Sequence, residues 1–112
     1  MAASLITPLS LGQSAITTSY ATLYTVPIGL KTFVKDIDIV NTTGVAIGIY
    51  VSLVPSGGTA SSSNAIFYNN ALPAYTTVQW CGSQVLTEGA TIQVKASAVG
   101  CTVTATGGEV VA

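Results

Sequence analysis

The chain has 112 residues, the usual size of one domain with a single hydrophobic core. Its charged residues are three lysines and four acids, with no arginine and no histidine, and its formal net charge is −1. This census excludes nucleic-acid binding through clustered cations, and it removes acid–base catalysis and metal binding by histidine. We therefore expect a protein that is not an enzyme, with no catalytic residue, cofactor, metal site or nucleic-acid partner.

Hydrophobic residues make up 49% of the chain, so a membrane-spanning segment has to be tested. The longest apolar run, residues 44–54, has about 11 residues, whereas a spanning helix needs about 20. The first residues also lack the basic stretch that begins a secretory signal. We expect no membrane partner and no export, and we expect Cys81 and Cys101 to be small buried or half-buried thiols. A disulfide between them is the alternative.

The first thirteen residues are apolar without clean strand alternation or a helical stripe. We expect residues 1–13 to form an N-terminal arm or edge strand, and residues 14–112 to form one β-sandwich domain. The segment either adds a strand to its own sheet or lies on a neighbouring subunit. The candidate interface residues in it are Leu5, Ile6, Leu9 and Leu11.

About one residue in three is valine, isoleucine or threonine, and these β-branched types favour strands. After a broken strand at residues 14–26, the next is expected at residues 32–40. There Ile37 and Ile39 follow one alternating phase and Val34 follows the other. This change of phase predicts a bulge near residues 35–36.

The clearest alternation lies at residues 46–54. Ile47, Ile49, Val51 and Leu53 are expected to point inward, whereas Gly48, Tyr50 and Ser52 point outward. Tyr50 is therefore a further candidate interface residue, while the aromatic side chains expected in the core are Phe33, Phe67 and Trp80.

Four further strands are expected along the chain. Short ones are predicted at residues 65–68 and 75–80, and clear alternation predicts two more at residues 91–97 and 101–106. Asparagine, glycine, proline and serine mark the turns between strands, at residues 41–44, 55–58, 69–73, 88–89 and 107–108. Seven or eight short strands predict an all-β, single antiparallel β-sandwich, with jelly-roll or immunoglobulin-like connections.

One pair of acids stands out. Asp36 and Asp38 lie two residues apart, so both carboxylates point to the same face of a strand. Calcium needs six to eight oxygen ligands, and only two other acids exist in the chain. We therefore interpret the pair as a solvated strand face near Lys31 and Lys35.

Several segments resemble small β-sandwich virion proteins of tailed bacteriophages. They are LYTVPIG at 23–29, IDIVNTTG at 37–44, IYVSLVPSGG at 49–58 and VLTEGATIQV at 85–94. The resemblance covers roughly residues 15–110 and lies in turns and strands. It implies a capsid decoration (cement) protein that stabilises the shell by bridging subunits, or else a tail or fibre accessory protein. It also implies a homotrimer in the virion, assembled in the host cytoplasm and contacting the major capsid protein or other virion proteins.

The residues themselves keep another hypothesis open. Five of the eight aromatic side chains are tyrosines, whose rings with a polar tip suit sugar stacking as well as protein interfaces. A carbohydrate-binding module for host attachment would use Tyr50 and other exposed rings, with surface glycans as its partners.

Overall fold

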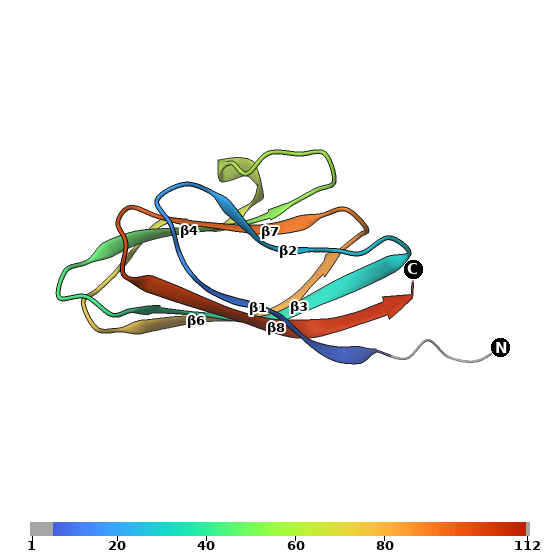
Figure 1. Cartoon of the computed structure of the whole chain (residues 1–112), viewed down its shortest axis with the longest axis horizontal. Helices are drawn as coiled ribbons and strands as arrows, with labels where there is room; N and C mark the ends of the chain where they lie inside the picture. Colours follow the sequence, from blue (N-terminus) through green and yellow to red (C-terminus); the bar gives the residue numbers. More distant parts are fainter. Residues whose placement is uncertain (1–5, 112) are drawn as a thin grey trace.

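The structure is a computed structural model that describes residues 6–111 (Figure 1). Among these residues, no helix is long and apolar enough to cross a membrane. The described part consists of eight strands and one short 3-10 helix. These are β1 (Thr7–Ala15), β2 (Ala21–Thr25), β3 (Leu30–Asn41), β4 (Ile47–Val54), η1 (Ser62–Asn64), β5 (Ala65–Leu72), β6 (Thr77–Leu86), β7 (Thr91–Ala96) and β8 (Cys101–Val111).

The strands form two four-stranded antiparallel sheets that pack face to face (Figure 1). One sheet has the order β1-β8-β3-β6, and the other has the order β2-β7-β4-β5. The chain changes sheet at every connection except the one between β4 and β5. This order is that of a jelly roll, so it decides between the two connections that the sequence left open.

The core lies between the sheets and is aliphatic. In β7, Ile92, Val94 and Ala96 are buried, and in β8, Val103 and Ala105 are buried. Both sets match the predicted alternation, which is confirmed. Burying a valine or isoleucine side chain contributes about 1.5–3 kcal/mol, so these positions account for much of the stability of the sandwich.

Strand β3 carries the predicted bulge. Its pairing with β6 and its pairing with β8 both shift between Val34 and Asp36. The extra residue, Lys35, is exposed, while Val34 and Ile37 on either side are both buried. The change of hydrophobic phase in the sequence therefore reports a real backbone irregularity.

The prediction for residues 46–54 is wrong at its end. Ser52 is buried although it was expected to face outward, and Leu53 is only half-buried. The pairing of β4 with β5 shifts between Val51 and Ser52. The segment before η1 lies against this end of the strand. There the Ser52 hydroxyl donates to the carbonyl of Ser61 at 3.5 Å.

Two predicted turns are strand instead. Residues 69–72 continue β5, with Asn69 in a left-handed conformation at φ 50°, and residues 107–108 lie within β8. Position 107 requires glycine for a reason other than a turn of the chain. A Cβ atom there would overlap the backbone carbonyl oxygen of Phe33 on the neighbouring strand. The residue therefore marks a close approach of two strands.

The N-terminal segment forms an edge strand of the sandwich in the described part of the chain. β1 pairs with β8 alone, and its register shifts between Ser10 and Gly12. The boundary expected between residues 13 and 14 falls inside this strand, which continues to Ala15. The single broken strand expected at residues 14–26 is the end of β1 followed by β2. Leu5 lies outside the described residues.

A buried asparagine ties three segments together at one end of the sandwich. The Asn41 side-chain nitrogen donates to the carbonyls of Val45 at 2.8 Å, Leu72 at 3.0 Å and Pro73 at 3.3 Å. Its side-chain oxygen accepts from the backbone nitrogen and the hydroxyl of Thr43, at 2.9 and 2.7 Å. Asn41 therefore fixes the β3–β4 turn against the end of β5.

Both cysteines are free thiols, but they differ in access. Cys101 is buried, as expected, whereas Cys81 in β6 is exposed, because this part of the edge strand is open to solvent. Burial also raises the pKa of the Cys101 thiol. We predict that a thiol reagent modifies Cys81 alone in the folded protein, and that Cys101 reacts only after denaturation. Mass spectrometry of the labelled chain measures this, and equal labelling of both cysteines under native conditions would contradict it.

Candidate functional site

Three tyrosines and one lysine gather on the outer face of the β2-β7-β4-β5 sheet. Tyr50 in β4 lies opposite Lys95 in β7. Its ring meets the rings of Tyr20 and Tyr68 edge to face, at centroid distances of 6.2 and 5.2 Å. The Lys95 Nζ atom lies 4.5 Å from the Tyr50 centroid and 5.1 Å from the Tyr20 centroid. We call these four residues the tyrosine–lysine cluster.

This face of the sandwich carries very little charge. Lys95 is the only charged residue in the four strands of the sheet. Beside the cluster, the backbone nitrogen of Gly48 donates to the hydroxyl of Ser97 at 2.9 Å, and the side chain of Asn69 closely approaches Gly48. The face thus presents aromatic rings, one cation, and hydroxyl and amide groups. Lys95 held by two rings keeps less conformational freedom than a solvated lysine.

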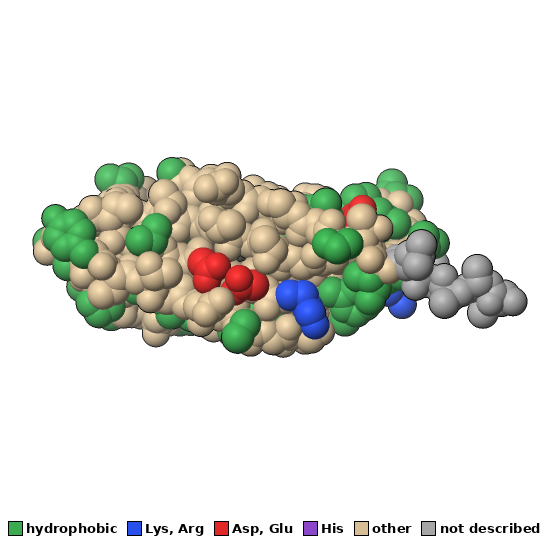
Figure 2. Space-filling view, turned by 90° about the horizontal axis from the view of Figure 1, so that it is seen from below, with side chains coloured by type: hydrophobic (Ala, Val, Ile, Leu, Met, Phe, Trp, Pro, Cys, Tyr) green, Lys and Arg blue, Asp and Glu red, His purple; other side chains and the backbone are tan. Residues whose placement is uncertain are grey.

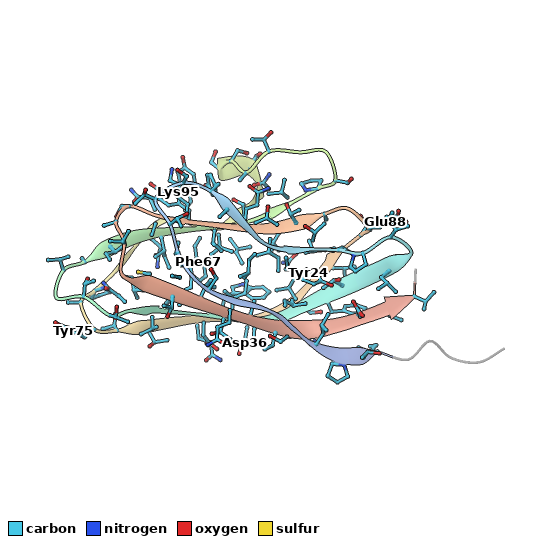
Figure 3. The ribbon with its side chains drawn as sticks, in the orientation of Figure 1. Tyr24, Asp36, Phe67, Tyr75, Glu88 and Lys95 are labelled. Atoms are coloured by element: carbon cyan, nitrogen blue, oxygen red, sulfur yellow. The ribbon has the colours of Figure 1, made fainter. Side chains whose placement is uncertain are left out.

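The opposite outer face, formed by the β1-β8-β3-β6 sheet, carries the acid pair. Figure 2 looks at this face and shows the two acids side by side with a lysine near them, and Figure 3 shows Asp36 and Lys95 on opposite sides of the sandwich. Gln79 donates to Asp36 at 3.0 Å. The pKa of Asp38 is raised by partial desolvation, then by the charge of Asp36 and a hydrogen bond to it. No group of three or more metal-ligating side chains occurs within residues 6–111.

We predict that the carboxyl of Asp38 titrates above the usual aspartate range, and that Asp36→Asn lowers its pKa by removing the neighbouring charge. Because this pKa is higher in the folded chain, the folded state binds the proton more tightly. The resulting stabilisation is present below the unfolded pKa and is lost as the pH rises through the folded value. NMR titration of the carboxyl carbons measures the shift, with Glu88→Gln as a control on a distant turn. An unchanged Asp38 midpoint in Asp36→Asn would contradict the coupling.

A hollow of about 320 Å³ lies on the same face as the acid pair. Ile6, Pro8 and Phe33 supply its apolar wall. Two glycines, Gly107 and Gly108, leave its floor without side chains. Figure 2 shows apolar side chains gathered on this face beside a lysine. The hollow therefore offers a neighbouring molecule apolar surface and strand backbone together.

The fold has counterparts among solved structures. Across 96% of the chain it matches the crystal structure of the infectious bursal disease virus VP2 subviral particle, with a TM-score of 0.53 and 13% identity. The structure of a T13 viral particle of the same virus matches the same share, with a TM-score of 0.49 and 14% identity. The chain has a jelly-roll fold shared with a viral particle protein. It spans about a third of the length of these matched chains.

No protein-family model and no curated protein sequence matches the chain. The likeness to VP2 is therefore a likeness of three-dimensional structure. At 13% identity it shows the fold alone, and the surfaces of this molecule have to indicate its function.

The structure separates the residues expected at an interface. Leu11 is only 2% exposed and packs in the core of its own chain, so it is not available to a neighbour. Leu9 is half-buried against the same core, whereas Ile6 is 61% exposed beside the hollow. Tyr50 is half-buried in the cluster on the other sheet. Ile6 and Tyr50 therefore belong to two surfaces rather than one.

Sequence reasoning missed part of each surface. Phe33 was expected in the core, but it lines the outer hollow, because the bulge in β3 places Thr32 and Val34 inward instead. Phe67 and Trp80 do pack against the core, half-buried. Lys95 was predicted to face outward, as Tyr50 was, but only the pairing of β4 with β7 brings these two side chains together.

Proposed function

We propose that the chain is a structural component of a virus particle, and more specifically a capsid decoration (cement) protein of a tailed bacteriophage. The observation that carries this proposal is the jelly-roll fold, which matches VP2 of a subviral particle across 96% of the chain. The resemblance of four segments to phage virion proteins supports the finer assignment. Since one fold serves many functions, the surfaces must also fit the role.

The surfaces favour adhesion between proteins. The sandwich is elongated (Figure 1). Large apolar side chains are exposed near both of its ends, in addition to those that line the hollow. At the end braced by Asn41, three neighbouring turns expose Val45, Tyr75 and Val99. At the opposite end, Ile28 and Val85 are exposed. Apolar surface at two ends suits a subunit that bridges two neighbours.

In this role the partners are the major capsid protein or other virion proteins, together with further copies of this chain as a homotrimer. Each contact can be weak, because many copies on a shell act together. The protein stiffens the shell by burying surface across subunit joints, and no chemical step is needed. Its place of action is the virion, after assembly in the host cytoplasm.

The cementing role can be tested by heating virus particles. Particles are stripped of the protein, and the temperature at which they release DNA is compared before and after the purified chain is added back. We expect the stripped particles to release DNA at a lower temperature and the added protein to restore the original one. An unchanged release temperature would contradict cementing. Loss of tail attachment or of host adsorption instead would favour the tail or fibre accessory role.

A further inference from the structure

We propose that the tyrosine–lysine cluster is a binding site for an acidic sugar, whose ring stacks on Tyr68 and whose carboxylate contacts the Lys95 Nζ atom. The site lies on the outer face of the β2-β7-β4-β5 sheet, opposite the acid pair and the hollow. The inference goes beyond the proposed structural role, because it assigns this face a ligand instead of a neighbouring subunit.

Tyr68 supplies the stacking surface. Its side chain is 58% exposed, although its ring packs edge to face against Tyr50 at 5.2 Å. The contact with Tyr50 therefore holds the Tyr68 ring in place, while much of the ring remains open to solvent. A pyranose ring presents a row of aliphatic C–H groups, which match the negatively polarised face of an aromatic ring. A ring that is already held by a second ring loses little freedom when a ligand stacks on it.

Lys95 supplies the charge preference. Its Nζ atom lies 4.5 Å from the Tyr50 centroid, so two successive contacts connect it to Tyr68. No acid occurs in the four strands of this sheet to neutralise the amine. An ammonium that faces two aromatic rings retains N–H donors for an incoming anion. A carboxylate on the sugar therefore gains a charge-assisted hydrogen bond that a neutral sugar lacks.

The surroundings of the cluster suit a sugar better than a protein partner. The groups beside it are polar, with the Ser97 hydroxyl and the Asn69 amide next to Gly48. The large exposed aliphatic side chains of the described residues lie elsewhere, chiefly on the turns and the other sheet. Sugars need several hydroxyl and amide partners, whereas the centres of protein interfaces are more apolar.

The geometry of the cluster also indicates how tightly a sugar should bind. The cluster lies on an open sheet face, where solvent weakens a single exposed charge contact. We therefore expect a dissociation constant on the order of millimolar for one sugar residue. Many copies on one particle would turn this weak contact into firm attachment to an acidic polysaccharide.

The test is an NMR titration of the purified chain with glucuronate and, in parallel, with glucose, which differs from it only at the C6 carboxylate. We expect saturable shifts at Tyr68 and Lys95 with glucuronate, and binding about 1.5- to fivefold weaker with glucose. Inorganic sulfate is a third probe. Sulfate binding as strong as that of glucuronate would overturn the sugar assignment, because it would show that charge alone is recognised.

Variants separate the two contacts. Lys95→Gln should bind glucuronate and glucose equally, and Tyr68→Ala should weaken both. The matched controls are Lys31→Gln and Tyr75→Ala, which remove an exposed lysine and an exposed tyrosine outside the cluster. Controls that weaken binding as much as the cluster variants would overturn the proposal. So would the absence of saturable shifts with either sugar, including the case in which the cluster resonances change only on contact with another virion protein.

Discussion

Replacing Gly107 by alanine is expected to lower the free energy of unfolding by about 3 kcal/mol or more. The added Cβ atom would meet the carbonyl oxygen and carbon of Phe33, which belong to the backbone of the adjacent strand. Backbone in the middle of a sheet cannot move aside without breaking ladder hydrogen bonds. The β3–β8 pairing in the centre of its sheet would have to separate, so the variant should unfold far earlier in urea or fail to fold.

Gly44→Ala is the matched control for this variant. Gly44 also has an ordinary negative φ, and a Cβ there would meet the Tyr75 side chain at 3.4 Å, which is normal contact distance. We expect its free energy of unfolding to stay within about 0.5 kcal/mol of that of the parent chain. If Gly107→Ala were as stable as Gly44→Ala, the close approach of the two strands would be wrong.

The second large effect is expected at Asn41. Asn41→Ala removes every partner that the side chain provides to the β3–β4 turn and to the end of β5. The carbonyls of Val45 and Leu72 lose this donor, and a small cavity opens in its place. Leaving buried polar groups unpaired costs about 1–3 kcal/mol for each group. We expect the free energy of unfolding to fall by about 3 kcal/mol, measured by urea denaturation.

Two further variants make the test specific. Asn70→Ala removes an exposed asparagine from β5 and should change stability by less than about 0.5 kcal/mol. Asn41→Asp keeps the acceptor for Thr43 but loses the donor to the carbonyls. It should therefore be destabilised as well. Full stability of Asn41→Asp would show that the donated hydrogen bonds do not hold this end of the sandwich.

The fold class could be predicted because inward and outward positions alternate clearly in the central strands. Residues 91–97 and 101–106 each have one buried face and one polar face, and this pattern has a single solution in a sandwich. The bulge in β3 was also readable, since the hydrophobic phase changes between Val34 and Ile37. The order of the strands was not, because it depends on long-range pairing that no local pattern encodes.

The errors have physical causes as well. Glycine pairs usually indicate turns, but Gly107 and Gly108 serve the close contact of strands inside β8. Ser52 is a polar residue of the kind expected at the surface, but it is covered by a loop. The sequence pattern does not predict where this loop packs.

The surfaces were harder to predict than the core. Tyr50 was identified as outward-facing from the alternation in its own strand. The rest of the tyrosine–lysine cluster comes from β7, β5 and the connection before β2, and only the completed sheet brings these residues together. A site assembled from four separate segments has no linear signature.

Cryo-electron microscopy of purified virus particles is the most direct measurement of the proposed role. We predict density for the elongated jelly roll at joints of the shell, in several symmetry-related copies, with its apolar turns or the hollow of the β1-β8-β3-β6 sheet against neighbouring subunits. Particles in which neither the map nor mass spectrometry detects this chain would contradict a structural role in the virion.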